Sequence, residues 1–244
     1  MINKITLLIL SFFDFLYQKK IISFLKKQKI PINTVIDVGA HKGETIKLLL
    51  QNLNPKKIIS FEASGINFNV IKKKIDILKR KFPNTKLILE NKALGSTGGY
   101  KKFKQMTESS SSTFASINLD SNYLKKKKFF LGINKNEELF DLVTIKMTTL
   151  SDYLKNNDLR EIDLLKIDTE GFEFEILKGA SEDLINFKLI FFEHHYDNMI
   201  KKGYTFTDVN RLLQSKKFKL VFKAKMPFRK TFEYIYQNQS QVKH

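Results

Sequence analysis

The 244-residue chain contains no cysteine, which excludes a disulfide framework, thiolate metal ligands and a cysteine nucleophile. This absence fits a reducing compartment, and we expect the chain to be cytoplasmic. Glycine and proline are scarce, with 10 and 4 residues, whereas hydrophobic residues make up 42% and charged residues 28% of the chain. The composition and length therefore predict one α/β domain with decorations and a sizeable core, and argue against general disorder.

Arginine is rare in this strongly basic chain. The formal net charge is +18, yet 39 of the 43 basic residues are lysine and only four are arginine. Proteins that read nucleic acid usually use arginine for bidentate contacts to phosphate and guanine, so nucleic acid is not the expected partner. Solvated lysine faces explain the charge best, and attraction to an acidic substrate or an anionic lipid surface is the alternative.

The chain begins with an apolar run that is too short to span a bilayer. Ile5 to Tyr17 is interrupted by Asp14 and followed by Lys19 and Lys20. The run also lacks the basic start and the small-residue cleavage site of a signal peptide. We expect residues 1–32 to form an amphipathic helical segment packed on the domain, with peripheral contact to the inner membrane surface as the alternative.

Strand-like and helix-like segments alternate through the rest of the chain. Apolar runs predict buried strands at 35–39, 57–63, 86–94, 162–168 and 188–193, and apolar spacing of three and four predicts helices between them. Two last strands at 218–223 and 232–236 predict a hairpin at the sheet edge. Repeated strand–helix–strand units favour an α/β fold with a doubly wound, mostly parallel, seven-stranded sheet.

Residues 95–141 interrupt this alternation. They combine a glycine-rich turn at 95–99, an expected strand at 101–106, a serine tract at 109–112 and a run of four lysines at 125–128, which we expect to be solvated. Long irregular segments in a compact domain are usually functional or disordered. We therefore expect an inserted β/loop cover beside a site, followed by a strand at 142–147.

A strand that runs into a glycine turn is the first chemical motif. In VIDVGAHKG, Asp37 precedes Gly39 and Gly43, which places backbone N–H groups at the sheet edge where ligands of open α/β folds bind. The spacing fits neither the G-x-G-x-x-G dinucleotide fingerprint nor a phosphate loop. Glu62 ends the next strand, where an acid can accept both ribose hydroxyls. These features predict a pocket for S-adenosylmethionine (SAM), and an ordinary strand–turn–helix with incidental acids is the alternative.

Acidic residues and histidines follow two later strands. KIDTEGFE places Asp168 and Glu170 at one strand end, and FEHHY places His194 and His195 at the next. Such groups can form a general base or bind a divalent metal. We expect a base and no metal, because adjacent histidines are more often a polar strand end than a ligand set.

Together these segments resemble the FkbM family of SAM-dependent methyltransferases. The resemblance covers about residues 33–238 and rests on VIDVGAHKGE, SFEAS, NKALG, the serine tract with TF, TLSDYL, LLKIDTEGFEFEILKGA and IFFEHH, among which KIDTEGFE is far more specific than the glycine turn. It implies a class I methyltransferase fold, which is Rossmann-like, SAM as methyl donor, and commonly a hydroxyl of a sugar or natural product as acceptor. By position, it implies that the cofactor is bound by Asp37, Gly39, Ala40, His41, Gly43, Glu62, Ala63, Asn91 and Ala93. Asn91 and Ala93 would flank the adenine.

The expected protein is therefore a SAM-dependent O-methyltransferase, with its catalytic domain over residues 33–240. Its acceptor is expected to be a small molecule or glycan. A sugar hydroxyl keeps its proton near neutral pH, so a base is needed. We expect His194 to be this base, because a neutral imidazole is competent at pH 7, with Asp168 and Glu170 orienting the acceptor or an ammonium group. In the alternative, both acids only cap the following helix and His194 packs in the sheet.

Two other interpretations of the sequence stay open. One is a non-catalytic protein of the SAM-binding fold that binds a glycan or scaffolds other enzymes. The other is an RNA methyltransferase, which the charge of +18 favours. The scarcity of arginine and the lack of an N-P-P-Y-type strand end count against chemistry on a base.

Overall fold

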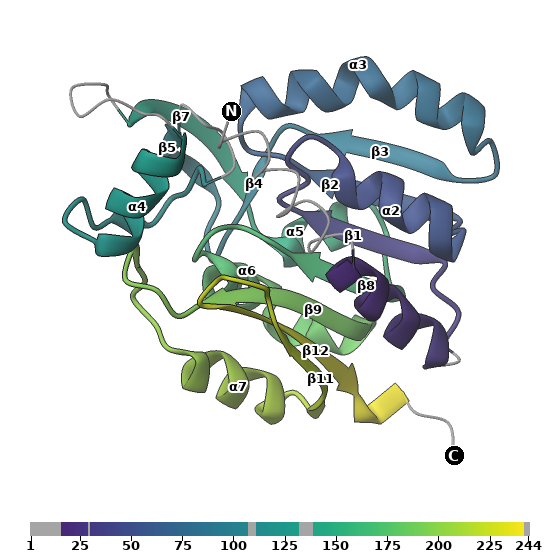
Figure 1. Cartoon of the computed structure of the whole chain (residues 1–244). Helices are drawn as coiled ribbons and strands as arrows, with labels where there is room; N and C mark the ends of the chain where they lie inside the picture. Colours follow the sequence, from purple (N-terminus) through teal and green to yellow (C-terminus); the bar gives the residue numbers. More distant parts are fainter. Residues whose placement is uncertain (1–15, 29, 107–110, 132–138, 242–244) are drawn as a thin grey trace.

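The structure is a computed structural model that describes residues 16–28, 30–106, 111–131 and 139–241 (Figure 1). Its centre is a seven-stranded sheet in the order β11-β12-β9-β8-β1-β2-β3. Within this sheet, β12 alone runs antiparallel to its neighbours. The expected parallel sheet with a hairpin at its edge is therefore confirmed. The strands are β1 (Thr34–Val38), β2 (Lys57–Phe61), β3 (Lys86–Glu90), β8 (Ile162–Ile167), β9 (Phe187–His195), β11 (Phe218–Lys225) and β12 (Thr231–Asn238).

Helices cover both faces of the sheet (Figure 1). One face carries a helix over residues 16–27 together with α2 (Glu44–Leu53) and α3 (Gly65–Lys81). The opposite face carries α5 (Leu150–Asn156), α6 (Glu173–Ala180) and α7 (Phe206–Ser215). Two short 3₁₀ helices complete the described helices, η1 (Ser181–Asn186) and η2 (Gln239–Gln241). Burial on both faces explains why the central strands are nearly continuous apolar runs.

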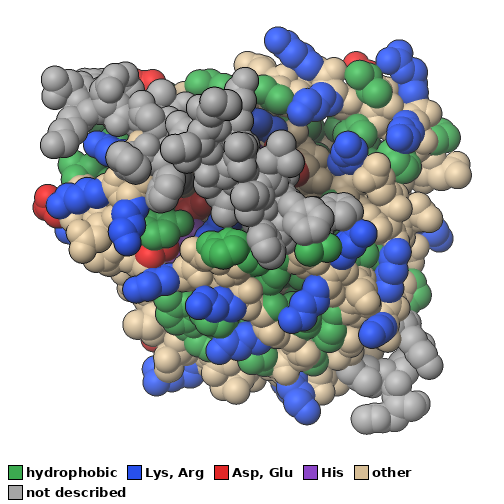
Figure 2. Space-filling view, viewed as in Figure 1, with side chains coloured by type: hydrophobic (Ala, Val, Ile, Leu, Met, Phe, Trp, Pro, Cys, Tyr) green, Lys and Arg blue, Asp and Glu red, His purple; other side chains and the backbone are tan. Residues whose placement is uncertain are grey.

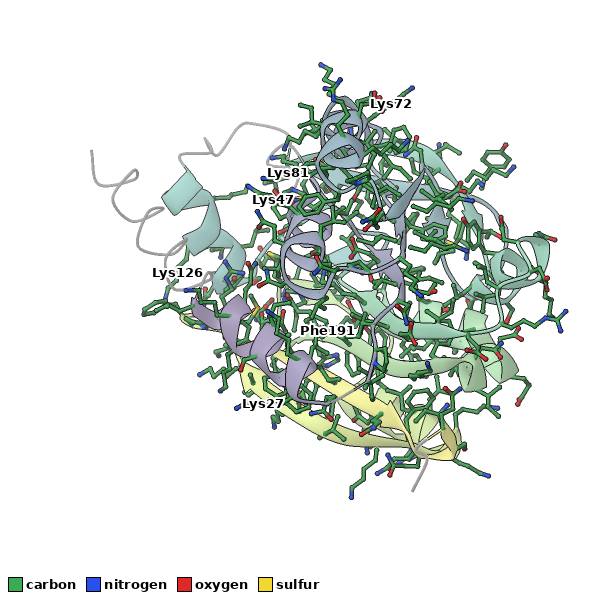
Figure 3. The ribbon with its side chains drawn as sticks, turned by 90° about the vertical axis from the view of Figure 1, so that its right-hand side faces the viewer. Lys27, Lys47, Lys72, Lys81, Lys126 and Phe191 are labelled. Atoms are coloured by element: carbon green, nitrogen blue, oxygen red, sulfur yellow. The ribbon has the colours of Figure 1, made fainter. Side chains whose placement is uncertain are left out.

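The N-terminal helix packs its apolar side on the sheet. Tyr17, Ile22 and Leu25 are buried in one cluster with Phe191 of β9, whereas Lys27 points outward (Figure 3). Residues 1–15 lie outside the described residues, so the expected membrane contact of this segment stays a prediction. In the part of the chain that the structure describes, no helix has the length and apolar character needed to cross a membrane.

The inserted cover is a small sheet with a helix beside it. Its strands are β4 (Ala93–Leu94), β7 (Phe140–Thr148) and β5 (Gly99–Met106), and α4 (Asn122–Leu131) lies between β5 and β7 in the chain. A further pair joins β6 (Ser116–Ile117) to β10 (Ile200–Lys201). One expectation was wrong, because the run at 86–94 divides into β3 and β4, which belong to different sheets. The four lysines at 125–128 lie in α4, and Lys125 and Lys126 are exposed there, as expected.

The lysine side chains are distributed over the surface. Figure 2 shows Lys and Arg side chains scattered over the visible face among hydrophobic and neutral side chains, without a single large basic patch. This distribution agrees with solvated lysine faces on the side shown.

Candidate active site

A cavity lies at the carboxyl ends of β1, β2 and β8, beside the inserted cover. This is the sheet edge at which the sequence predicts a ligand. Many of the residues singled out in the sequence line this cavity, although Asp37, Ala40, Gly43, Asn91 and His194 do not. Its lining comprises Val38, Gly39, His41, Phe61, Glu62, Ala63, Asn67, Lys92, Ala93, Leu94, Phe103, Ser112, Phe114, Asp168, Thr169, Glu170 and Phe172.

The glycine turn after β1 is fixed against both neighbouring strands. Gly39 and Gly43 have φ of +86° and +87°, in the left-handed region that favours glycine. A Cβ atom on Gly39 would lie 1.9 Å from the carbonyl oxygen of Asp168, so only glycine fits there. The amides of Gly39 and Ala40 donate to the carbonyl oxygen of Phe61, at 2.9 and 3.1 Å. The turn therefore forms a rigid wall of the cavity, and Gly43 is the N-cap residue that precedes α2.

Glu62 lies at the cavity with its carboxylate already oriented by the backbone. Its Oε2 accepts from the His41 amide at 2.7 Å and its Oε1 from the Ser64 amide at 2.8 Å. Burial raises the pKa of Glu62 to about 7, although these hydrogen bonds favour the ionised form. Asn91 Nδ2 donates to the carbonyl oxygen of Glu62 at 2.8 Å, so Asn91 orients this segment from outside the cavity.

Lys166 lies between two acids at the ends of β1 and β8. Its Nζ donates to Oδ2 of Asp168 at 3.0 Å and lies 3.8 Å from Oδ1 of Asp37. Asp37 is fully buried behind this lysine, and burial raises its pKa to about 6. Burial also opposes ionisation of Asp168, but Lys166 holds the pKa of Asp168 below its usual range. Asp168 therefore faces the cavity as an anion, whereas Asp37 does not line the cavity and lies behind Lys166.

Glu170 and His195 join the ends of β8 and β9. His195 Nε2 lies 3.2 Å from Oε2 of Glu170 and 3.0 Å from Oε1 of Glu193, and its Nδ1 lies 3.5 Å from Oδ2 of Asp197. Burial alone would lower the pKa of His195, but these carboxylates raise it well above its usual range. His195 is therefore an imidazolium that links Glu170 to the end of β9.

His194 lies on the other face of β9 and does not meet Asp168 or Glu170. Its Nε2 is 3.1 Å from Nζ of Lys202, and its ring lies edge-on to Tyr196 with centroids 4.9 Å apart. Burial, with Lys202 nearby, lowers the pKa of His194 to about 3. The expected convergence of the three side chains is therefore not found. Neighbouring residues of a strand point to opposite faces, and the face toward Glu170 belongs to His195.

The cover completes the cavity with aromatic rings. Phe114 lies between Phe103 and Phe172, with ring centroids 4.7 and 5.1 Å apart. Gln105 of β5 accepts a hydrogen bond from the hydroxyl of Ser64 at 3.0 Å, next to Glu62. The sequence predicts that the cover lies beside the site but not which of its side chains line the cavity. The contacts of the cover with the loops after β2 and β8 join residues that are far apart in the chain.

The donors and acceptors of the cavity fit SAM. The buried carboxylate of Glu62 can accept ribose hydroxyls, and ionised Asp168 suits a cationic group such as an ammonium or sulfonium. The turn beside the cavity matches neither the G-x-G-x-x-G dinucleotide fingerprint nor the pattern of a phosphate loop. Among the residues that the structure describes, no group of three His, Asp or Glu side chains has an arrangement that could hold a metal ion.

A family model decides the relationship. The methyltransferase FkbM domain matches residues 37–220. The chain belongs to the FkbM methyltransferase family. The expected family and methyltransferase class are therefore confirmed, and SAM is the cofactor. No protein with a curated description matches this FkbM-family chain in sequence.

Solved structures show the same fold. Methyltransferase FkbM from Methylobacillus flagellatus KT matches with a TM-score of 0.53 and 13% identity, over 84% of this chain and 43% of that chain. An uncharacterized protein from Listeria monocytogenes serotype 4b matches with a TM-score of 0.50 and 10% identity, over 93% and 69%. The METTL16 methyltransferase domain matches with a TM-score of 0.50 and 13% identity, over 91% and 66%. The FkbM-family chain thus spans less than half the length of the Methylobacillus protein.

Proposed function

We propose that the chain transfers a methyl group to a hydroxyl of a sugar, a glycoconjugate or a natural product. The observation that carries this proposal is that one cavity is lined both by groups suited to bind the cofactor and by carboxylates suited to accept a proton. Glu62 and the glycine turn form one end, and the carboxylates of Asp168 and Glu170 lie on the same lining. Carboxylates accept hydrogen bonds from hydroxyl groups and can take a proton from them.

In this proposal, one set of residues binds the cofactor. Glu62 accepts the ribose hydroxyls, and ionised Asp168 faces the cationic end. When bound, SAM supplies an electrophilic methyl group. Asp37 contributes through Lys166, and Asn91 by fixing the backbone of Glu62. The remaining binding positions are Gly39, Ala40, His41, Gly43, Ala63 and Ala93, of which Ala40 and Gly43 shape the turn and the others line the cavity.

In this proposal a carboxylate removes the proton of the acceptor hydroxyl. His194 is the base expected from the sequence, but it does not line the cavity. Asp168 and Glu170 do, and each can orient a hydroxyl by accepting its hydrogen bond. The chain's contribution to the reaction is then to hold the acceptor in line and to remove its proton.

The test is transfer of label from radioactive SAM to separate pools of glycans and of RNA, with the full chain. We expect label in the glycan pool. Asp168→Asn should lower transfer and also weaken SAM binding, because it removes the carboxylate charge that faces the cationic end of the cofactor. Label in the RNA pool would instead favour an RNA methyltransferase. SAM binding without transfer to any pool would favour a binding or scaffold protein.

A further inference from the structure

Three parts of the chain hold Glu170 in place at the cavity. Its backbone has φ +50°, a left-handed conformation that is uncommon for residues other than glycine. Thr113 of the cover donates its hydroxyl to the carbonyl oxygen of Glu170 at 2.7 Å. His195 of β9 contacts its carboxylate. A capping role would not require these constraints, because Glu173, and not Glu170, accepts the Gly171 amide ahead of α6.

The position of His195 is itself determined by several contacts. Glu193 and Asp197 lie on either side of its ring, and the Thr231 hydroxyl on β12 is 3.2 Å from its Nδ1. Lys202 donates to its backbone carbonyl oxygen. The side chain is 9% exposed, so the ring has little freedom to turn away from Glu170.

We propose that His195 is a positioning residue that orients the Glu170 carboxylate toward the acceptor hydroxyl, and that Glu170 is the base. This inference rests on the proposed function. As the acceptor oxygen bonds to the methyl carbon and the carbon–sulfur bond breaks, the hydroxyl proton passes to a Glu170 oxygen. The bonding electrons stay on sulfur, so no further reactant is needed.

The geometry makes His195 a partner and not the base. Both ring nitrogens face carboxylates at ion-pair distances, which favours the doubly protonated ring, and a doubly protonated ring has no lone pair to accept a proton. Asp168 after β8 and Glu173 of α6 also interact electrostatically with the ring, and His194 on its own strand is neutral. The cation beside His195 is Lys202, and the carboxylates outweigh it, which keeps the imidazolium form.

Histidine NMR of the full chain tests the contact without any acceptor. The chain has four histidines, so nitrogen-15 labelling of histidine resolves each ring. We expect both nitrogens of His195 to stay protonated at pH 7.5, while His194 stays neutral. Glu170→Gln should lower the pKa of His195 by about 1 or more, because an opposite charge is lost within 4 Å. Glu182→Gln is the control, since Glu182 is exposed and pairs with Lys216, and it should leave His195 unchanged.

Labelled transfer to the accepting glycan pool tests the consequence. His195→Gln should lower turnover by about 10-fold or more, with the SAM dissociation constant changed by less than about threefold. The acidic limb of its turnover–pH profile should move to higher pH, because Glu170 loses a neighbouring cation. Glu170→Gln keeps the shape of the side chain and should lose about 10²–10⁴-fold in turnover, even if His195→Gln folds poorly.

The proposed function and the roles of His195 and Glu170 can be disproved independently of each other. A neutral His195 at pH 7.5, or an unchanged His195 in Glu170→Gln, overturns the positioning role whatever the activity is. Turnover near the wild-type level in Glu170→Gln overturns the base. Absence of SAM binding contradicts the proposed function, whereas the NMR measurement still decides whether His195 and Glu170 form a charged pair.

Discussion

At the residue scale, Glu62 is the side chain on which cofactor binding depends most. Two backbone amides already orient its carboxylate, and each oxygen keeps a lone pair for a ribose hydroxyl. Glu62→Ala should therefore weaken SAM binding by about 1–3 kcal/mol through lost charge-assisted hydrogen bonds. Titration calorimetry measures this, with Glu161→Ala at the opposite end of β8 as the control. Equal weakening in both variants would contradict the role of Glu62.

The raised pKa of Glu62 predicts how SAM binding depends on pH. The carboxylate is protonated below a pH of about 7 and ionised above it, and the ionised form is the better acceptor. SAM affinity should therefore increase as pH rises from about 6 to about 8. Glu62→Gln cannot ionise, so the difference between wild type and this variant isolates the effect. Parallel pH profiles for the two proteins would show that Glu62 does not titrate in this range.

Gly39 tests the close contact between β1 and β8. Gly39→Ala should lower the free energy of unfolding by more than about 1 kcal/mol, because alanine disfavours φ +86° and its Cβ would overlap the carbonyl oxygen of Asp168. Urea unfolding provides the measurement. Gly203→Ala is the matched control, since no atom lies within 4 Å of its added Cβ. If Gly39→Ala unfolds at the wild-type midpoint, the turn is not packed as described.

The sequence identifies the cavity edge but not which histidine faces it. Gly39, Glu62, Asp168 and Glu170 follow strands, so topology alone brings them to one edge. Nearly every residue of β9 is buried, and a strand buried on both faces shows no alternation from which the side of a residue can be inferred. For this reason the sequence prediction named His194, although His195 is the histidine whose side chain faces Glu170. The sequence could have indicated that Lys166 belongs to the site, because a lysine inside a buried apolar strand needs an acidic partner.

At the element scale, the helix over residues 16–27 is an integral part of the core on one face of the sheet. Leu25 is 2% exposed and packs in the same cluster as α2 and α3. Leu25→Ala should cost about 2–5 kcal/mol of unfolding free energy by leaving a cavity. Lys26→Ala, on the exposed side of the same helix, should change little. Both are measured by denaturant unfolding, and equal effects would show that the helix is not docked by its apolar side.

The cover shows where element prediction from sequence ends. Residues 86–94 were expected to form one strand, yet the chain leaves the main sheet after Glu90 and Ala93 pairs with Met147. The polar residues Glu90, Asn91 and Lys92 mark the break. The new partner of Ala93 has no local signal, because β4 is defined by its pairing with a strand more than fifty residues away. Helix α4 is also absent from the sequence prediction, because its lysine-rich segment has only a weak amphipathic pattern.

At the scale of the whole molecule, the charges are divided between the surface and the site. The chain carries a net charge of +18, with lysines spread over the visible face (Figure 2). Acids instead gather at one edge of the sheet, at and behind the cavity. Glu62, Asp168 and Glu170 line the cavity, and Glu193 and Asp197 lie around His195 behind it. Such a site favours a cofactor with cationic groups over one that carries phosphates.

Titration calorimetry of the full chain with SAM, NAD and ATP tests this account most directly. The account predicts saturable binding of SAM and of its demethylated product, and no appreciable binding of NAD or ATP. The demethylated product lacks the sulfonium charge, so it should bind more weakly than SAM if ionised Asp168 faces that end of the cofactor. Binding of NAD or ATP without binding of SAM would contradict the account.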